Sequence, residues 1–244
     1  MKSIHVNKLF AIINVKTRAL LSKNFIIMPL FTIGFTFIIK IVYGSINIET
    51  DMSGYILGLG AVMNIGTVGV YCVSATLAEE KEKHTLRTLM TSSVNGLEFF
   101  LGSIIPVIMM MVIINFILIP ISGCSFDIKD YLIYGLLSLV CSITSCMIGM
   151  VIGVFAKNQV TASTLTTPII LMLMMVPMFS RFNQFSELIS QFLFTGILLD
   201  TINLITAGAV DVIDWLSIVI LVIEIVVSVI VFIIIYRKNG YEKE

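Results

Sequence analysis

The sequence is poor in the residues that catalytic and metal sites require. Charged residues make up 12% of the 244 positions, and the only two histidines, His5 and His84, lie far apart. None of the motifs H-E-x-x-H, G-x-S-x-G or C-x-x-C occurs. No lysine follows a glycine, so the chain has no G-x-x-x-x-G-K-[ST] loop for ATP phosphates. We therefore expect neither an enzyme nor a metal site in this chain.

Cysteine and net charge add little. The four cysteines are Cys72, Cys124, Cys141 and Cys146, and three of them lie in apolar runs, where small packing residues are the usual interpretation. Lys plus Arg and Asp plus Glu both number 15, so the net charge is zero and argues neither for nor against a nucleic-acid partner. We expect no nucleic-acid partner and no separate catalytic domain.

Apolar residues, by contrast, are abundant and continuous. They make up 58% of the chain, and the mean hydropathy is +1.05. Because a helix of about 20 residues crosses a hydrocarbon core, and because lipid offers no partner to backbone polar groups, we expect an all-α integral membrane protein. The six predicted transmembrane helices are 25–43, 54–78, 99–120, 131–155, 160–179 and 215–236.

Basic residues fix the predicted orientation. Twelve of the 15 fall on one side of the six spans: Lys2, Lys8, Lys16, Arg18, Lys23, Lys81, Lys83, Arg87, Lys157, Arg237, Lys238 and Lys243. The other side has Lys40, Lys129 and Arg181. The positive-inside rule places both termini in the cytoplasm.

Two segments outside the spans also have a helical pattern. In residues 1–23, apolar positions such as Leu9, Ile13 and Leu20 recur at helical spacing, and Lys8 and Lys16 lie elsewhere on the wheel, which predicts an amphipathic interfacial helix rather than a solvated tail. Residues 180–214 are too apolar for a free loop and predict two short re-entrant helices on the outer side. The Gly149-x-x-x-Gly153 pattern indicates either a tight bundle or a dimer.

The segment 79–97, between spans 2 and 3, carries the most information. It begins Glu79-Glu80-Lys81-Glu82-Lys83, where Glu79 and Lys83 are spaced for an ion pair. Farther on, Leu86, Leu89 and Met90 share one face of a helix. The residues alone allow two interpretations, a solvated connector or a docking element for a soluble partner.

The run from Glu80 to Ser93 resembles the E-x-E-x-G-T-L-x-x-L pattern of ABC-2 type transporter permeases. Glu80, Glu82, Thr85, Leu86 and Leu89 match, and His84 stands where the family usually has glycine. The whole chain resembles a single ABC-2 type transmembrane domain, 1–244, with an amphipathic interfacial helix at 1–23, a cytoplasmic coupling helix within 79–97 and re-entrant helices within 180–214.

The resemblance implies a function and partners. It implies a permease subunit of an ATP-driven exporter in the bacterial plasma membrane, paired with a second permease, the same or related, and with two ABC ATPase subunits. ATP and Mg²⁺ would bind the ATPase, and this chain would hold no cofactor. The coupling residues would be Glu80, Lys81, Glu82, Lys83, Thr85, Leu86, Leu89 and Met90.

Three polar residues inside the predicted spans are candidates for a substrate path: Glu224, Asn64 and Asn115. A carboxylate near the middle of a span must face protein or water. Glu224 therefore either lines a substrate path or contacts the partner subunit, or it bonds polar groups such as Asn64 or Asn115.

By analogy with small ABC-2 permeases, we expect the exported substrate to be an amphipathic peptide or drug, as in antimicrobial peptide export, resistance or self-immunity. Two other classes remain open: an ion-coupled secondary transporter that uses Glu224, and a membrane anchor or sensor that transports nothing.

Overall fold

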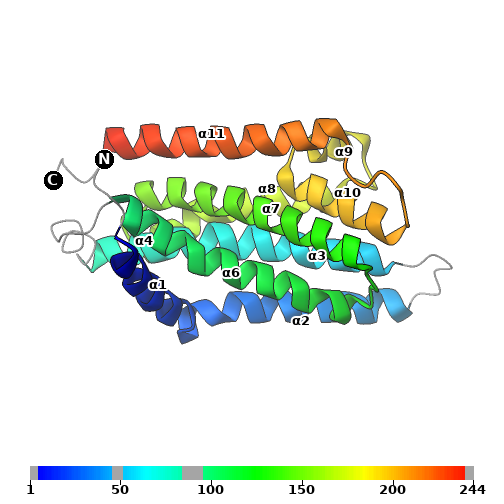
Figure 1. Cartoon of the computed structure of the whole chain (residues 1–244), viewed down its shortest axis with the longest axis horizontal. Coiled ribbons are helices and arrows are strands. Elements are labelled where there is room, and N and C mark those ends of the chain that lie inside the picture. Colours follow the sequence, from blue (N-terminus) through cyan, green and yellow to red (C-terminus); the bar gives the residue numbers. More distant parts are fainter. Residues whose placement is uncertain (1–4, 46–51, 84–95, 240–244) are drawn as a thin grey trace.

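The chain folds into a bundle of nearly antiparallel helices (Figure 1). The structure is a computed structural model that describes residues 5–45, 52–83 and 96–239. Within these ranges every regular element is a helix. The elements are α1 (Val6–Leu20), α2 (Lys23–Ser45), α3 (Ser53–Asn64), the π-helix η1 (Ile65–Cys72), α4 (Val73–Glu82), α6 (Gly96–Ser122), α7 (Ile128–Phe155), α8 (Gln159–Phe179), α9 (Gln184–Ser190), α10 (Phe194–Thr206) and α11 (Trp215–Asn239).

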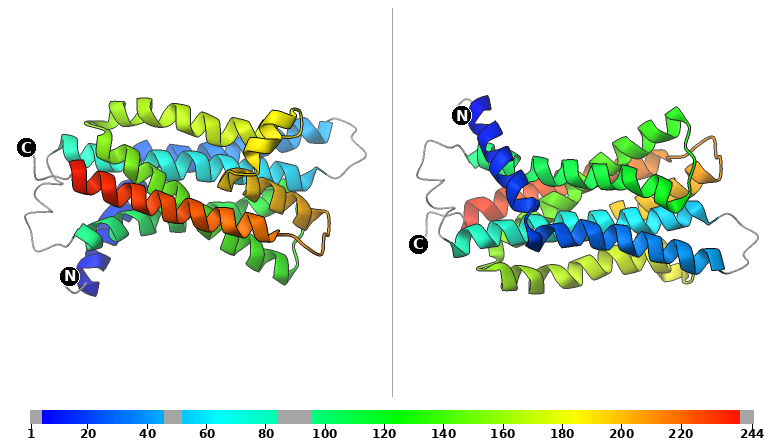
Figure 2. Two further views of the ribbon diagram at one scale, coloured as in Figure 1. Left: turned by 90° about the horizontal axis from the view of Figure 1, so that it is seen from above. Right: turned by 90° about the horizontal axis from the view of Figure 1, so that it is seen from below.

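Six helices in the described part of the chain are long and apolar enough to cross a membrane, which confirms the six predicted spans. The bundle has two ends. One, the α1 end, holds α1, the end of α4 and the α7–α8 turn, and the other, the α9 end, holds α9 and the start of α11 (Figures 1 and 2). Short α9 and α10 meet at 100°, as a re-entrant pair or a broken seventh span does.

The second span is the centre of the bundle. Helices α3, η1 and α4 run on as one 30-residue span, Ser53–Glu82, of which 89% of the most apolar window is buried. The sequence predicted a shorter span, 54–78, because Glu79, Glu80 and Glu82 are charged. The helix continues through them since Glu80 and Glu82 find partners on neighbouring helices and Glu79 pairs with Lys83 one turn later.

Close packing of α7 on this central span depends on Gly149 and Gly153. A Cβ at Gly149 would lie 2.8 Å from the carbonyl oxygen of Val70 and 2.9 Å from that of Gly69. One turn later, a Cβ at Gly153 would lie 2.9 Å from Leu77 Cδ2 and 3.2 Å from Ser74 Cα. The Gly149-x-x-x-Gly153 pattern therefore serves packing within the bundle of this chain, one of the two predicted roles.

The π-helix lies on the same seam. A π-helical turn is wider than an α-helical one and leaves backbone groups poorly aligned with their usual partners. Ser145 of α7 donates a hydrogen bond to the carbonyl oxygen of Ile65, the first residue of η1, over 2.5 Å. A neighbouring helix thus adds one hydrogen bond to the wide turn.

Helix α1 crosses the bundle obliquely at its end (Figure 2) and packs on the start of α6. Ile12, Lys16 and Leu20 form its buried stripe, whereas Phe10 and Leu21 are exposed at 65% and 61%. Exposed aromatic and aliphatic side chains on a helix at the end of a bundle fit contact with a lipid surface.

We predict that the seam between α7 and the central span tolerates no methyl group. The two nearest contacts of a Gly149→Ala Cβ are backbone oxygen atoms, so the helices must separate, at a loss of about 1–3 kcal/mol of stability. Gly34→Ala is the control, because nothing lies within 4 Å of its Cβ position on α2. The measurement is the thermal unfolding midpoint in detergent, and equal midpoints for the two variants would contradict the seam.

Candidate functional site

The coupling residues predicted from the sequence fall into two groups. Glu80, Lys81, Glu82 and Lys83 form the last turn of α4 and the residue after it, at the α1 end of the bundle. Thr85, Leu86, Leu89 and Met90 lie outside the described residues, so their placement stays a prediction.

The Glu80 carboxylate reaches across to α1. Lys16 Nζ lies 2.5 Å from Glu80 Oε1, and the Lys16 side chain is only 6% exposed. The same ammonium sits 4.8 Å from the centroid of the Phe99 ring. Burial lowers the pKa of Lys16 below the ordinary lysine value, and the charge of Glu80 opposes this shift. The sequence pattern placed Lys16 away from the apolar face of this helix, and that prediction was wrong: Lys16 is buried in one stripe with Ile12 and Leu20, because its charge has a partner in Glu80.

A second carboxylate fixes the start of α1. Glu98, in the first turn of α6, is 1% exposed and its Oε1 accepts a hydrogen bond of 2.7 Å from the backbone N–H of His5. Since His5 is the N-cap of α1, this bond satisfies a backbone donor at the helix start and places a negative charge at the positive end of the helix dipole. Helix α1 is thus held at both ends by charged groups of the bundle.

Lys81 and Glu82 point instead toward the turn between α7 and α8. Lys81 Nζ donates to the carbonyl oxygens of Gly153, Val154 and Ala156. Glu82 Oε2 accepts a hydrogen bond of 3.3 Å from the backbone N–H of Gln159. The predicted ion pair between Glu79 and Lys83 is present at 2.5 Å, where Glu79 raises the pKa of the exposed Lys83.

Asn64 and Asn115 bond to each other in the middle of the bundle. Asn64 Nδ2 donates to Asn115 Oδ1 over 2.8 Å and to the carbonyl oxygen of Met111 over 2.9 Å. Asn115 Nδ2 donates to Ser138 Oγ over 2.5 Å, and the Tyr134 hydroxyl donates to the Asn115 carbonyl oxygen. All of these side chains are buried, so the network joins α3, α6 and α7. A role in a substrate path stays a prediction for Asn64 and Asn115, but their geometry is that of packing residues.

The sequence offered Asn64 or Asn115 as possible partners of Glu224, but in the structure Glu224 bonds to a backbone group of α10. It lies near the middle of α11, and its Oε1 accepts a hydrogen bond of 3.3 Å from the backbone N–H of Phe194, the first residue of α10. Asn64 and Asn115 are not its partners. The carboxylate caps the N-terminus of α10, where backbone donors and the helix dipole favour a negative charge. Its Oε2 is buried, and no hydrogen-bond partner for it is present in the described part of the chain.

Two clefts open on the described surface. The first, of about 250 Å³, lies between α2, η1 and α8, and its lining is Met28, Thr67, Tyr71, Ser163, Thr166, Thr167 and Ile170. The hydroxyls of Ser163, Thr166 and Thr167 donate to carbonyls of the preceding turn of α8, so each hydroxyl proton is satisfied without water. This cleft offers weakly polar oxygen atoms within an apolar span.

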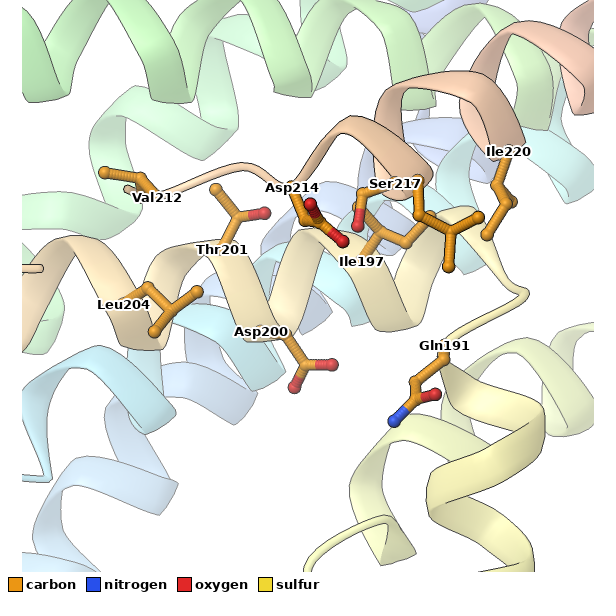
Figure 3. Close-up of a pocket in the computed structure, with 10 residues that line it drawn as sticks. Gln191, Ile197, Asp200, Thr201, Leu204, Val212, Asp214, Ser217 and Ile220 are labelled. Atoms are coloured by element: carbon orange, nitrogen blue, oxygen red, sulfur yellow. The ribbon is translucent and has the colours of Figure 1, made fainter. Parts of the chain in front are cut away.

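The second cleft, of about 280 Å³, lies at the α9 end, among α9, α10 and the start of α11 (Figure 3). Gln191, Asp200, Asp214 and Ser217 supply its polar groups, and Ile197, Leu204 and Ile220 are among its apolar ones. The predicted candidates Asn64, Asn115 and Glu224 line neither cleft.

We predict that the asparagine network contributes to stability. Asn115→Leu keeps the approximate volume of the side chain but leaves the Asn64 amide and the Ser138 hydroxyl without their partner, at a loss of about 1–2 kcal/mol. Thr167→Val is the matched control, because that hydroxyl bonds only within its own helix. Thermal unfolding in detergent distinguishes the two. An Asn115→Leu protein as stable as the control would show that the network is dispensable.

Comparison with known families identifies the family of this chain. Residues 46–234, more than half of the chain, match the family model described as ABC-2 family transporter protein. A search of curated proteins found no match. The family match includes the central span, the segment that follows it, the re-entrant pair and most of the last span. The chain therefore belongs to the ABC-2 family of transporter proteins.

Proposed function

We propose that this permease subunit works in an ATP-driven exporter of the bacterial plasma membrane, with a separate ABC ATPase docked at the segment that follows α4. The main support for this proposal is that the central span connects the buried core to the segment where the ATPase would dock. It is the most buried span of the bundle, and it runs without interruption to a charged turn at the α1 end. A partner that moves this turn acts directly on the core of the permease.

The orientation in the membrane supports the same arrangement. The described residues Lys8, Lys16, Arg18, Lys81 and Lys83 gather at the α1 end, which the positive-inside rule assigns to the cytoplasm. ABC ATPases work where ATP is, so the docking segment faces the correct compartment. ATP and Mg²⁺ bind the ATPase in this proposal, because the chain has no sequence for a phosphate-binding loop.

The assembly we propose has two permease subunits, the same or related, on two ATPase subunits. The exposed apolar faces of α2, α8 and α11 supply the surface that a second permease and lipid would cover. In the most apolar windows of these three spans, only 22%, 22% and 11% of residues are buried within the chain. An apolar surface of this extent requires a nonaqueous neighbour.

The substrate that fits best is an amphipathic molecule such as a peptide or drug, exported for release, for resistance or for self-immunity. The α2–η1–α8 cleft combines hydroxyl groups with the apolar side chains of Met28 and Ile170, as a path for a molecule with both polar and apolar parts requires. Asp200 and Asp214 in the cleft at the α9 end favour substrates with positive charge on the exit side.

An ion-coupled carrier is the second candidate, because Glu224 has a buried, unpartnered oxygen inside the described bundle. The two candidates differ in their energy source. A carrier transports in liposomes that contain no ATPase when an ion gradient is imposed, and an ABC permease does not.

We predict that Leu86→Asp abolishes docking. In our proposal Leu86 inserts into an apolar groove of the ATPase, and an aspartate there would bury an unpaired charge, weakening binding at least about tenfold, or about 1.4 kcal/mol. The measurement is recovery of the ATPase with the affinity-tagged permease.

Val210→Asp is the matched control, because Val210 is 96% exposed in the segment between α10 and α11, at the other end of the bundle. Both variants should insert into the membrane as wild type does. Full ATPase recovery with Leu86→Asp would mean that the segment after α4 is only a solvated connector.

A further inference from the structure

The last turn of α4 contacts three different helices through three consecutive residues. Side chains of successive helical residues point about 100° apart, so neighbours in sequence reach different directions. Glu80 bonds to Lys16 of α1, Lys81 to the end of α7, and Glu82 to the start of α8. This turn therefore connects the central span to three neighbouring helices. We call the contacts of Lys81 and Glu82 with the α7–α8 turn the joint.

Lys81 closes the end of α7. Its Nζ donates to the carbonyl oxygens of Gly153, Val154 and Ala156 over 2.9, 2.5 and 3.2 Å. The chain leaves the helix at Ala156, whose ψ is 131°, so these last carbonyls lack the N–H donors of a further turn. An ammonium group there satisfies them and faces the negative end of the helix dipole.

Glu82 bonds to the start of α8, where the sign of the helix dipole is opposite to that at the end of α7. The N–H of Gln159, the first residue of α8, donates to Glu82 Oε2, and the N–H of Thr161 donates to Asn158 Oδ1 over 2.8 Å. A carboxylate at a helix N-terminus faces the positive end of the dipole. The two charges of α4 thus match the two helix ends that meet at the α7–α8 turn.

Lys81 can reach this turn because α4 and α7 pack closely at Gly153. Leu77 of α4 packs where a Cβ of Gly153 would stand, and Lys81 follows Leu77 by four residues on the same face of the helix. The close backbone approach therefore carries the ammonium one helical turn farther, to the last carbonyls of α7. A larger residue at position 153 would move this contact out of reach.

We propose that Lys81 and Glu82 are positioning residues that make the end of α4 and the α7–α8 turn move as one body, so that a displacement imposed on the segment after α4 reaches α7 and α8. This inference rests on the proposed function for its source of motion. The bonds themselves belong to this chain and do not require the ATPase. Lys81 and Glu82 thus act inside the permease, in addition to any contact with the partner.

The joint is tested first in the full-length permease alone, in lipid nanodiscs, by hydrogen exchange of residues 156–159. Lys81→Met keeps the length of the side chain but removes the ammonium, and we expect the amides of the turn to exchange several-fold faster. Lys83→Met is the control, because Lys83 is exposed and, among the described residues, forms its ion pair with Glu79 of α4. Lys81→Arg should restore slow exchange, since a guanidinium also donates to carbonyls. Wild-type exchange in Lys81→Met would overturn the joint.

The transmission is tested in the complex with the ATPase, purified from native membranes. Gln184, at the start of α9 beyond α8, is exposed and takes a cysteine probe, in a background where the partly exposed Cys124 is serine. In wild type and in Lys129→Met, a control whose exposed lysine lies in the first turn of α7, at the end opposite the Lys81 contact, adding ATP should change the labelling rate at least about twofold. Lys81→Met should lose this change in complexes purified with the ATPase bound.

Lys81→Arg should regain the response to ATP. A wild-type response in Lys81→Met, or a loss that Lys81→Arg shares, would overturn the transmission role. If wild-type permease recovers no ATPase at all, the proposed function fails, while the hydrogen-exchange result still decides whether the joint exists.

Discussion

The close backbone approach of α7 to the central span is the constraint on which the rest of the bundle depends. At Gly149 and Gly153 the two helices are so close that a single methyl group would meet backbone or core atoms. The same approach lets Ser145 stabilise the wide turn of η1 and lets Lys81 reach the end of α7. Packing in lipid has little hydrophobic driving force between helices, so close van der Waals contact of this kind supplies much of the stability.

Many polar side chains of the described helices find hydrogen-bond partners within the bundle. Hydroxyls on α8 donate to carbonyls of their own helix, asparagines pair between helices, and the Glu224 carboxylate meets the N-terminus of α10. Lys16, Glu80, Lys81 and Glu82, which bond to other elements, gather at the α1 end of the bundle. This cluster forms a charged junction where a soluble partner would act.

Much of the fold could be predicted from the sequence because the length of an apolar stretch alone identifies a membrane-spanning helix. The six spans and the pair of short helices before the last span were predicted, and the observed spans differ from the predicted ones by a few residues at their ends. The second span was predicted too short because a count of charges cannot show that Glu80 and Glu82 have partners on other helices. The ion pair between Glu79 and Lys83 was predicted correctly because it is local to one turn.

The site was less accessible to sequence reasoning, since it depends on how each helix is rotated in the bundle. A span that is apolar on all sides has no periodicity to mark its buried face, so the partner of Glu224 could not be identified from the pattern. Lys16 belongs to a buried stripe that is visible only once Ile12 and Leu20 are known to face α6. Thr85, Leu86, Leu89 and Met90, the family-like part of the segment after α4, lie outside the described residues.

The most direct measurement of the central claim, that a separate ATPase acts on this chain through the segment after α4, is photo-crosslinking in native membranes. A photoreactive amino acid is placed at position 86, and a second protein carries it at Ile128, an exposed residue at the other end of the bundle. The account predicts a covalent adduct between position 86 and a protein that contains a phosphate-binding loop, and none from position 128. Adducts from position 86 to lipid alone, or the same ATPase adduct from both positions, would contradict it.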